Sequence, residues 1–322
     1  MNSANSAPPE AGQTIAALFF GMAGELSSEP LEALIRAGIE VRAVVMPAFD
    51  AARASAPYLV RPPAGARTSR RSLPMLGVMP RVTTVDIAAA HGIPVLEVAR
   101  LRHPLTLAAL EAFAPDVICV SCFSRRIPAE VLAIPRLGAI NLHPSLLPEN
   151  RGPDPLFWTF RRGDPETGVT AHLMDEGLDT GPILRQERFP LADGITEGEL
   201  LAQCARAGAE VLVKSVLDLA EGHAAPLPQD PARATTYSWP TAEDYVITPE
   251  RPARWAYNFC RGVMGRGEPV TARVDDTVFR ILEPLAFQPD QRLDTGWSYE
   301  DNMLSLQCAP GVFTAQAIEE RT

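Results

Sequence analysis

Apolar runs and amphipathic stretches alternate along the first half of the chain. Uninterrupted apolar runs are typical of strands that are buried on both faces of a sheet. One such run lies at residues 15–20, and further strands are predicted at residues 39–46, at 116–122, where the strand is expected to be buried, and at 139–142. Helical patterns separate them, at residues 29–37, 84–91 and 105–113 and again from about Pro128. This order predicts an α/β fold with a doubly wound, mostly parallel sheet. In such sheets ligands bind beyond the carboxyl ends of the strands.

The first of these helices carries terminal signals. Ser28 is expected to cap a helix that begins at Glu29, with Pro30 in its first turn and Gly38 at its end. The turn before it, residues 21–24, lacks the glycine spacing of a dinucleotide-binding fingerprint, so we do not infer a dinucleotide.

The pattern changes in the last third of the chain. A long helix is predicted over residues 196–221, and the proline-rich stretch 222–236 is interpreted as a linker. A helix over 251–263 and short strands at 270–274, 278–282, 303–308 and 312–317 follow, with Pro310-Gly311 as a turn. We therefore expect four parts: a disordered leader at 1–14, a catalytic domain at 15–221, the linker at 222–236, and a small β-rich domain at 237–322.

Composition narrows the class of protein. The 322 residues are 46% hydrophobic and carry a net charge of −10, with a sequence pI near 5.1, so there is no overall attraction to nucleic acid or anionic lipid. No apolar run approaches the roughly 20 residues that span a bilayer, and residues 1–14 lack the features of a secretory signal. Five cysteines, an odd number, favour reduced thiols and a cytoplasmic location.

Three side chains within residues 138–181 suit acyl transfer without a covalent intermediate. Asn141 is a neutral amide donor, His143 can shuttle a proton, and Asp179 can orient the histidine. Asn141 and His143 are two residues apart at the end of a predicted strand, so both point to one face. Asp179 lies on a later loop and must reach that face through the fold. Together with the motifs around them, these groups predict a catalytic site rather than a structural Asn–His pair.

The motifs around them resemble the folate-dependent formyltransferases, the family of methionyl-tRNA formyltransferase and glycinamide ribonucleotide formyltransferase. Asn-x-His precedes Ser-Leu-Leu-Pro, and Arg-Gly, Glu-Thr-Gly-Val-Thr and Leu-Asp-Thr-Gly follow in the family's order. Residues 237–322 loosely resemble the C-terminal barrel domain of methionyl-tRNA formyltransferases. The resemblance implies a formyltransferase-like fold with Asn141, His143 and Asp179 as catalytic residues. It also implies a folate site lined by Ser145, Leu146, Leu147 and Pro148, with 10-formyltetrahydrofolate as formyl donor and no metal.

Several residues keep two interpretations. His172 either contacts substrate or is a buried histidine with satisfied hydrogen bonds. Arg151, at the expected mouth of the site, makes either a surface ion pair or a contact to the acceptor or the folate tail. Cys119 and Cys122 have metal-like spacing, but no second Cys/His pair is near them and we expect no metal. Cys122 to Pro128 departs from the family pattern, and its Arg125 and Arg126 bear on the shape of the folate pocket.

The acceptor amine is the main open question. Residues 47–85 carry six arginines, with Arg67, Arg70 and Arg71 close together, against one acid. The family resemblance implies that this loop reaches the acceptor arm of initiator methionyl-tRNA, although it has no lysine; a solvated loop is the alternative. The acceptor is therefore expected to be initiator methionyl-tRNA, with an amino sugar nucleotide or another small amine as the alternative. A non-catalytic folate- or RNA-binding relative is the other class that we keep, and the oligomeric state is left open.

Overall fold

The chain divides into two compact units. In a computed structural model, residues 14–50, 56–61 and 82–320 are described. The first unit contains residues up to Arg151 together with Gly168–Arg188 and Leu201–Thr235. The second contains Gly152–Thr167, Phe189–Leu200 and the chain from Thr236 onward. The predicted domain boundaries stay a prediction, and the predicted leader lies, apart from Thr14, outside the described residues.

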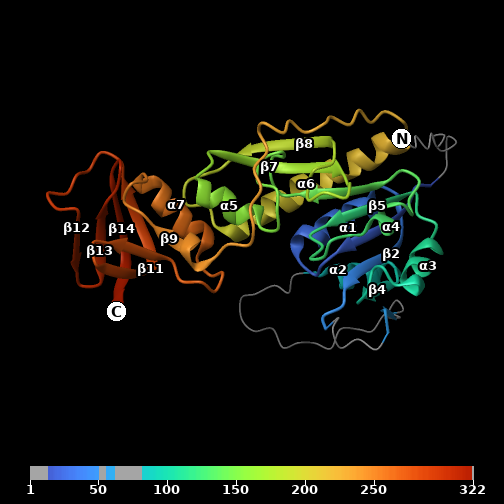
Figure 1. Cartoon of the computed structure of the whole chain (residues 1–322), viewed down its shortest axis with the longest axis horizontal. Coiled ribbons are helices and arrows are strands. Elements are labelled where there is room, and N and C mark those ends of the chain that lie inside the picture. Colours follow the sequence, from blue (N-terminus) through green and yellow to red (C-terminus); the bar gives the residue numbers. More distant parts are fainter. Residues whose placement is uncertain (1–13, 51–55, 62–81, 321–322) are drawn as a thin grey trace. The chain divides into compact units, whose positions relative to one another are not determined.

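An eight-stranded sheet forms the centre of the first unit (Figure 1). Its order is β3-β4-β2-β1-β5-β6-β7-β8. The central run from β4 to β6 is parallel, and β3 and β7 pair antiparallel with their neighbours β4 and β6. The strands are β1 (Ala16–Gly21), β2 (Glu40–Pro47), β3 (Tyr58–Arg61), β4 (Val95–Val98), β5 (Val117–Ser121), β6 (Ala139–His143), β7 (Glu166–Leu173) and β8 (Ile183–Pro190). The predicted α/β fold with a mostly parallel sheet is confirmed.

Helices connect these strands close to where the pattern predicts them. They are α1 (Glu25–Arg36), α2 (Thr84–Ala90), α3 (Pro104–Glu111), α4 (Ala129–Leu132) and α6 (Glu197–Ala220), of which α6 runs from the second unit into the first. The residues of β1 and β5 are buried along their whole length, as predicted for the strands at 15–20 and 116–122. The core of the unit is therefore built on both faces of the parallel strands.

The predicted start of α1 is wrong. The helix begins one turn earlier, at Glu25, so that Ser28 and Pro30 lie inside it rather than at its cap and first turn. Proline has no N–H to give to the carbonyl four residues back, which is that of Leu26. The Ser121 hydroxyl at the end of β5 donates to the Leu26 carbonyl instead. A tertiary contact thus satisfies the group that proline leaves without its helical partner.

The second unit contains a six-stranded sheet with the order β12-β13-β14-β11-β10-β9. Its strands are β9 (Val246–Ile247), β10 (Thr271–Val274), β11 (Thr277–Gln288), β12 (Trp297–Glu300), β13 (Met303–Gln307) and β14 (Val312–Glu320). It also contains the helices α5 (Pro155–Arg162) and α7 (Ala253–Val263) and the short 3₁₀ helix η1 (Ala242–Tyr245). The predicted β-rich C-terminal region is confirmed. Strands β9 and β12 were not predicted; both are short, although the four residues of β12 alternate between aromatic and polar side chains.

Close packing of α5 on α7 gives a first testable prediction. A Cβ atom at Gly262 would lie 2.3–2.5 Å from three ring atoms of the buried Phe160. Replacing a helical glycine with alanine gains roughly 1 kcal/mol from propensity, but overpacking a core costs roughly 1–3 kcal/mol. Because an aromatic ring cannot yield, we expect Gly262→Ala to lower the free energy of unfolding of this unit in chemical denaturation. Gly198→Ala in α6, where a Cβ meets nothing within 4 Å, is the control and should be neutral or stabilising.

The sequence predicts no apolar segment long enough to span a bilayer, and the helices of the structure can be compared with this prediction. Among the described residues, no helix combines the length and apolarity needed to cross a bilayer.

Candidate active site

Strand β6 presents Asn141 and His143 on one face at its carboxyl end, as the two-residue spacing predicts. Leu142, between them, points the opposite way and packs against α6. A Cβ at Gly208 of α6 would come within 2.6 Å of the Leu142 side chain, so this glycine lets the helix approach the strand closely. The helix on one face thereby fixes the strand that carries the polar pair on the other.

Asp179 joins this pair from the loop between β7 and β8. Its Oδ2 atom lies 3.7 Å from His143 Nδ1, and its Oδ1 atom lies 3.4 Å from Asn141 Nδ2. The Asp179 side chain is only 10% exposed. Two neighbouring side chains of β6 and a carboxylate that is 38 positions from Asn141 therefore converge on one small buried region. The predicted convergence is present in the geometry, while the catalytic roles stay a prediction.

The backbone determines which nitrogen of His143 carries a proton. His143 Nε2 lies 2.9 Å from the carbonyl oxygen of Asn150. Since a carbonyl only accepts, Nε2 must be protonated, and Nδ1 is the basic atom of the neutral ring. Nδ1 faces Asp179. A proton that arrives on the ring is thus taken up beside a carboxylate.

Burial and charge act on His143 in opposite directions. Burial lowers the pKa of His143, the Asp179 charge and the hydrogen bond to Asn150 raise it, and His172 lowers it again. Burial is the largest effect, so the pKa lies below its ordinary value of 6.5. Asp179 favours the charged ring, but it does not outweigh burial. His143 is therefore neutral at pH 7 and ready to accept a proton.

His172 lies on β7 directly opposite Asn141 and belongs to the same polar group. Its Nδ1 atom lies 2.8 Å from the Leu173 carbonyl and must be protonated, so Nε2 accepts from Asn141 Nδ2 at 3.2 Å. The ring is 2% exposed. Both ring nitrogens therefore have protein partners, as in the second interpretation of this residue, and one of these partners is the amide of Asn141.

The loop that carries Asp179 is shaped by its own residues. Asp175 Oδ1 accepts from the Gly177 N–H at 2.9 Å and from the Thr180 hydroxyl at 2.6 Å. A Cβ at Gly177 would lie 1.9 Å from that hydroxyl, and one at Gly181 would lie 1.8 Å from the Leu173 carbonyl. Asp179 itself has a left-handed backbone with φ of 54°. The loop is thus a tight turn that requires glycine at positions 177 and 181, where a side chain would collide with neighbouring atoms.

The predicted folate loop is held to the neighbouring strand. The Leu147 N–H donates to the Thr170 hydroxyl at 3.1 Å, and this hydroxyl donates to the Ser145 carbonyl at 2.6 Å. Ser145 Oγ donates to the Glu149 carbonyl at 2.8 Å. Ser145 and Leu147 are buried. The loop that contains Ser145, Leu146, Leu147 and Pro148 is therefore rigid, and its folate role stays a prediction.

Arg125 and Arg126, which follow β5, donate hydrogen bonds to different parts of the backbone. The Arg125 guanidinium donates to the carbonyls of Val98 and Ala99 at 3.2 and 2.7 Å, and to that of Ala48 at 3.1 Å. It thereby links the carboxyl ends of β4 and β2. Arg126 donates to the Glu176 carbonyl in the Asp179 loop. These arginines, which depart from the family pattern, serve as backbone clamps at the edge of the sheet that carries the site.

The remaining predicted site residues divide into two groups. Arg151 directs its guanidinium at the side-chain oxygen of Gln229, with Nε and Nη2 at 3.1 and 2.6 Å. Arg67, Arg70 and Arg71 lie outside the described residues. Gln229 was not identified from the sequence, because it lies in the proline-rich stretch interpreted as a linker and no motif marks it.

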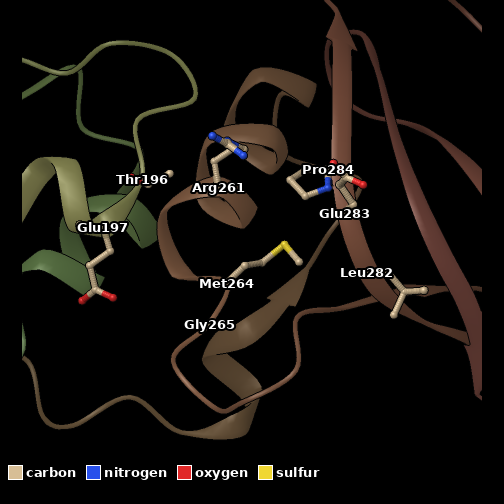
Figure 2. Close-up of a pocket in the computed structure, with 9 residues that line it drawn as sticks. Thr196, Glu197, Arg261, Met264, Gly265, Leu282, Glu283 and Pro284 are labelled. Carbon is tan, nitrogen blue, oxygen red and sulfur yellow. The ribbon is translucent and has the colours of Figure 1, made fainter. Parts of the chain in front are cut away.

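Within the described part of the chain, the cysteines form no further candidate site. All five cysteines are free thiols, and burial raises the pKa of Cys119 to about 12. Over residues 14–50, 56–61 and 82–320, no three His, Cys, Asp or Glu side chains gather as metal ligands would. A hollow of about 330 Å³ lies in the second unit, between the start of α6, the end of α7 and β11 (Figure 2). None of the predicted site residues that the structure describes lines it.

Comparison with known proteins gives a consistent family. The family model described as formyl transferase matches residues 65–216. Two methionyl-tRNA formyltransferases from Synechococcus strains are 46% and 45% identical over 185 residues, which is 57% of this chain and 57% of each relative. The chain therefore spans little more than half the length of these curated relatives. The methionyl-tRNA formyltransferase of Acidobacterium capsulatum is 37% identical over 233 residues, 72% of this chain and 68% of that protein.

Solved structures are similar in fold at low sequence identity. An N-formyltransferase from Helicobacter canadensis, in complex with folinic acid and dTDP-3-aminofucose, has a TM-score of 0.66 at 15% identity and covers 95% of this chain and 100% of its own. HypX from Aquifex aeolicus in complex with tetrahydrofolic acid has a TM-score of 0.57 at 16% identity, covering 96% of this chain and 46% of its own. At these identities the likeness concerns the fold alone.

Proposed function

We propose a formyl-transfer function for this chain, which belongs to the formyltransferase family. The formyl group comes from 10-formyltetrahydrofolate and goes to an amine. The observation that carries the proposal is the meeting of Asn141, His143 and Asp179 in one buried group, with the basic nitrogen of a neutral histidine beside a carboxylate. A donor, a base and an orienting anion are what direct acyl transfer to an amine requires.

Each residue has a distinct part in this reaction. The acceptor nitrogen attacks the formyl carbon, a C–N bond forms, and an oxyanion develops that the Asn141 amide stabilises. Asn141 Nδ2 makes a longer contact to Asp179, at 3.4 Å, than to His172, at 3.2 Å, so its weaker hydrogen bond is the one that turns to the oxyanion. His143 Nδ1 takes the proton of the attacking amine and returns it to N10 of the folate as the old C–N bond breaks. Asp179 stabilises the ring while it is charged.

The donor is assigned to the two loops beside this group. The loop of Ser145 to Pro148 and the loop of Asp175 to Asp179 both border the carboxyl end of β6, where a doubly wound sheet binds its ligand. Both loops have their backbones fixed by side-chain hydrogen bonds. Support also comes from similar folds whose structures contain folinic acid or tetrahydrofolic acid.

Initiator methionyl-tRNA is the leading acceptor in this proposal. The support is the identity of 37–46% to methionyl-tRNA formyltransferases and the arginine-rich segment at 47–85. Within this assignment Arg67, Arg70 and Arg71 contact tRNA phosphates, and Arg151 lies toward the acceptor. An acceptor that takes part in translation and five free thiols together favour a cytoplasmic location.

A small amine such as an amino sugar nucleotide is the second candidate. It is favoured by the charge of residues 236–322, which contain 13 Asp and Glu against 8 Arg and no Lys. A polyanion such as tRNA gains affinity from cationic surfaces, whereas this region carries a net negative charge. Structures with a similar fold include a complex with dTDP-3-aminofucose.

A direct assay tests the proposal. The pure protein is incubated with 10-formyltetrahydrofolate and either charged initiator tRNA or dTDP-amino sugars, and the product mass and tetrahydrofolate release are followed. A gain of one formyl group on an acceptor with stoichiometric tetrahydrofolate supports it. Tight folate binding with no transfer to any amine would favour the non-catalytic relative instead.

The pH profile follows from the state of His143. Because burial lowers its pKa below 6.5, the base form persists to lower pH, and we expect the acid limb of kcat/KM to lie below pH 6.5. Asp179 raises this pKa, so Asp179→Asn should move the limb to still lower pH while also lowering the plateau. Steady-state rates over the acid range provide the measurement. A limb that moves upward in this variant would contradict the arrangement.

A further inference from the structure

The catalytic carboxylate sits on a backbone that needs outside support. Asp179 has a φ of 54°, a left-handed conformation that side-chain-bearing residues rarely adopt. Its carboxylate lies 3.4–3.7 Å from Asn141, His143 and His172, at the outer limit of direct interaction. A small displacement of this loop would therefore separate the carboxylate from both histidines. The hydrogen bonds of Asp175 to Gly177 and Thr180 restrict the loop from within, and a contact from outside the loop would restrict the position of Asp179 further.

Gln229 provides two hydrogen bonds to this short turn. Its Nε2 atom donates to the Asp179 carbonyl at 2.8 Å and to the Gly181 carbonyl at 2.7 Å. A primary amide has two N–H groups, and both are used here, one on each side of Thr180. The amide thus closes the turn from outside, across nearly 50 residues of sequence.

Arg151 determines which way this amide points. Gln229 Oε1 accepts from Arg151 Nε and Nη2 at 3.1 and 2.6 Å. A flipped amide would set its oxygen against two carbonyls and its N–H groups against a guanidinium. The charged, forked donor therefore enforces the orientation in which Gln229 can hold the loop.

The same segment also supports the hydrogen-bond partner of His143. The Asn150 N–H donates to Thr235 Oγ1 at 2.9 Å, and the Thr235 N–H donates to the Pro148 carbonyl at 3.2 Å. The Asn150 carbonyl is the group that fixes His143 Nε2. The segment from Gln229 to Thr235 thus braces the loops that hold both His143 and Asp179.

We propose that Gln229, oriented by Arg151, is a positioning residue that holds Asp179 against His143 during the transfer. This rests on the proposed formyl-transfer function and deepens it. The stretch that its composition marks as a linker is, in this proposal, part of the site's architecture.

The test replaces Gln229 in the full chain. Gln229→Met keeps the length of the side chain but removes all four hydrogen bonds, and Gln229→Glu keeps the pairing with Arg151 but offers no donor to the two carbonyls. We expect kcat to fall on the order of 10- to 100-fold in both, as for a misplaced catalytic group. The KM for the folate donor should stay within about twofold, because binding contacts remain.

Gln307 offers a matched control in the second unit. Its amide likewise donates to two carbonyls, of Cys308 at 2.9 Å and Gly311 at 3.0 Å, and accepts from the Leu293 N–H at 2.8 Å. Gln307→Met removes a similar set of hydrogen bonds remote from the site. It should leave kcat unchanged, even if it lowers the melting temperature as much as Gln229→Met does.

A second measurement is independent of catalysis. The ring protons of His143, titrated by NMR, should show a lower pKa in Gln229→Met than in the parent, as in Asp179→Asn, because the carboxylate no longer lies beside Nδ1. Unchanged kcat together with an unchanged His143 titration would overturn the proposal. If the parent protein transfers no formyl group, the proposed function fails, and the titration alone then supports or rejects the positioning role.

Discussion

Replacing His143 with alanine is expected to lower kcat by about 10²- to 10⁴-fold, the usual contribution of a positioned proton shuttle. The reason is that Nδ1 is the basic atom facing Asp179, since Nε2 is committed to the Asn150 carbonyl. Product formation from 10-formyltetrahydrofolate, with acceptor saturating, provides the measurement. His91→Ala, at an exposed turn outside the site, is the control and should retain the parent rate.

The same experiment extends to the other two residues. Asn141→Ala should cost about 10²- to 10³-fold, as the loss of one oxyanion donor does elsewhere. Because the three residues act together, the His143 and Asp179 losses should not multiply in a double variant. Parent-like turnover in His143→Ala would reject the assignment. The stability of this variant must be checked separately, since losing the hydrogen bond between His143 Nε2 and the Asn150 carbonyl costs roughly 0.5–1.5 kcal/mol.

The parts of the site that the sequence predicts are those that depend on local geometry. Asn141 and His143 share a face because side chains alternate along a strand, and a strand is predicted at 139–142, directly before His143. No such rule brings Asp179 to the same place. Its approach depends on the antiparallel pairing of β7 with β6 and on the tight turn after β7, so only the family motif indicated it.

The parts that sequence reasoning missed depend on long-range hydrogen bonds. Pro30 suggested a helix start, but it lies inside α1 because Ser121, more than 90 residues away in sequence, satisfies the Leu26 carbonyl. Gln229 lies in a stretch whose prolines predict an irregular backbone. An irregular backbone is compatible with the hydrogen bonds that the Gln229 side chain makes. What composition could not indicate is that its amide would meet the Asp179 loop.

His143 shows how burial changes the protonation state that its neighbouring carboxylate alone would suggest. A carboxylate beside a histidine suggests a charged ring, and the Asp179 charge does act in that direction. The ring of His143 is nevertheless enclosed, so the cost of placing a charge there is larger. From this balance we expect a neutral base that becomes charged only during the reaction. The sequence alone does not show how deeply His143 is buried, so this state could not be derived from it.

The salt dependence of the reaction is expected to separate the two acceptors. If the arginine segment binds tRNA, the apparent affinity should fall steeply with salt, with a slope of about −0.7 to −0.9 for each phosphate neutralised. Changing Arg67, Arg70 and Arg71 together to alanine should then raise the KM for charged tRNA and flatten that slope. The KM for the folate donor should be unaffected, which controls for damage to the site.

With a small amine as acceptor the same triple change should leave the kinetics almost unaltered, since such a molecule carries few phosphates for these arginines to neutralise. Transfer to an amino sugar nucleotide that is insensitive to salt, with none to charged tRNA, would reject the tRNA assignment and leave formyl transfer itself standing. That outcome would agree with the excess of 13 acidic over 8 basic residues at 236–322. The opposite outcome would require the basic segment alone to provide the electrostatic attraction, because the C-terminal region carries the same sign of charge as the phosphates.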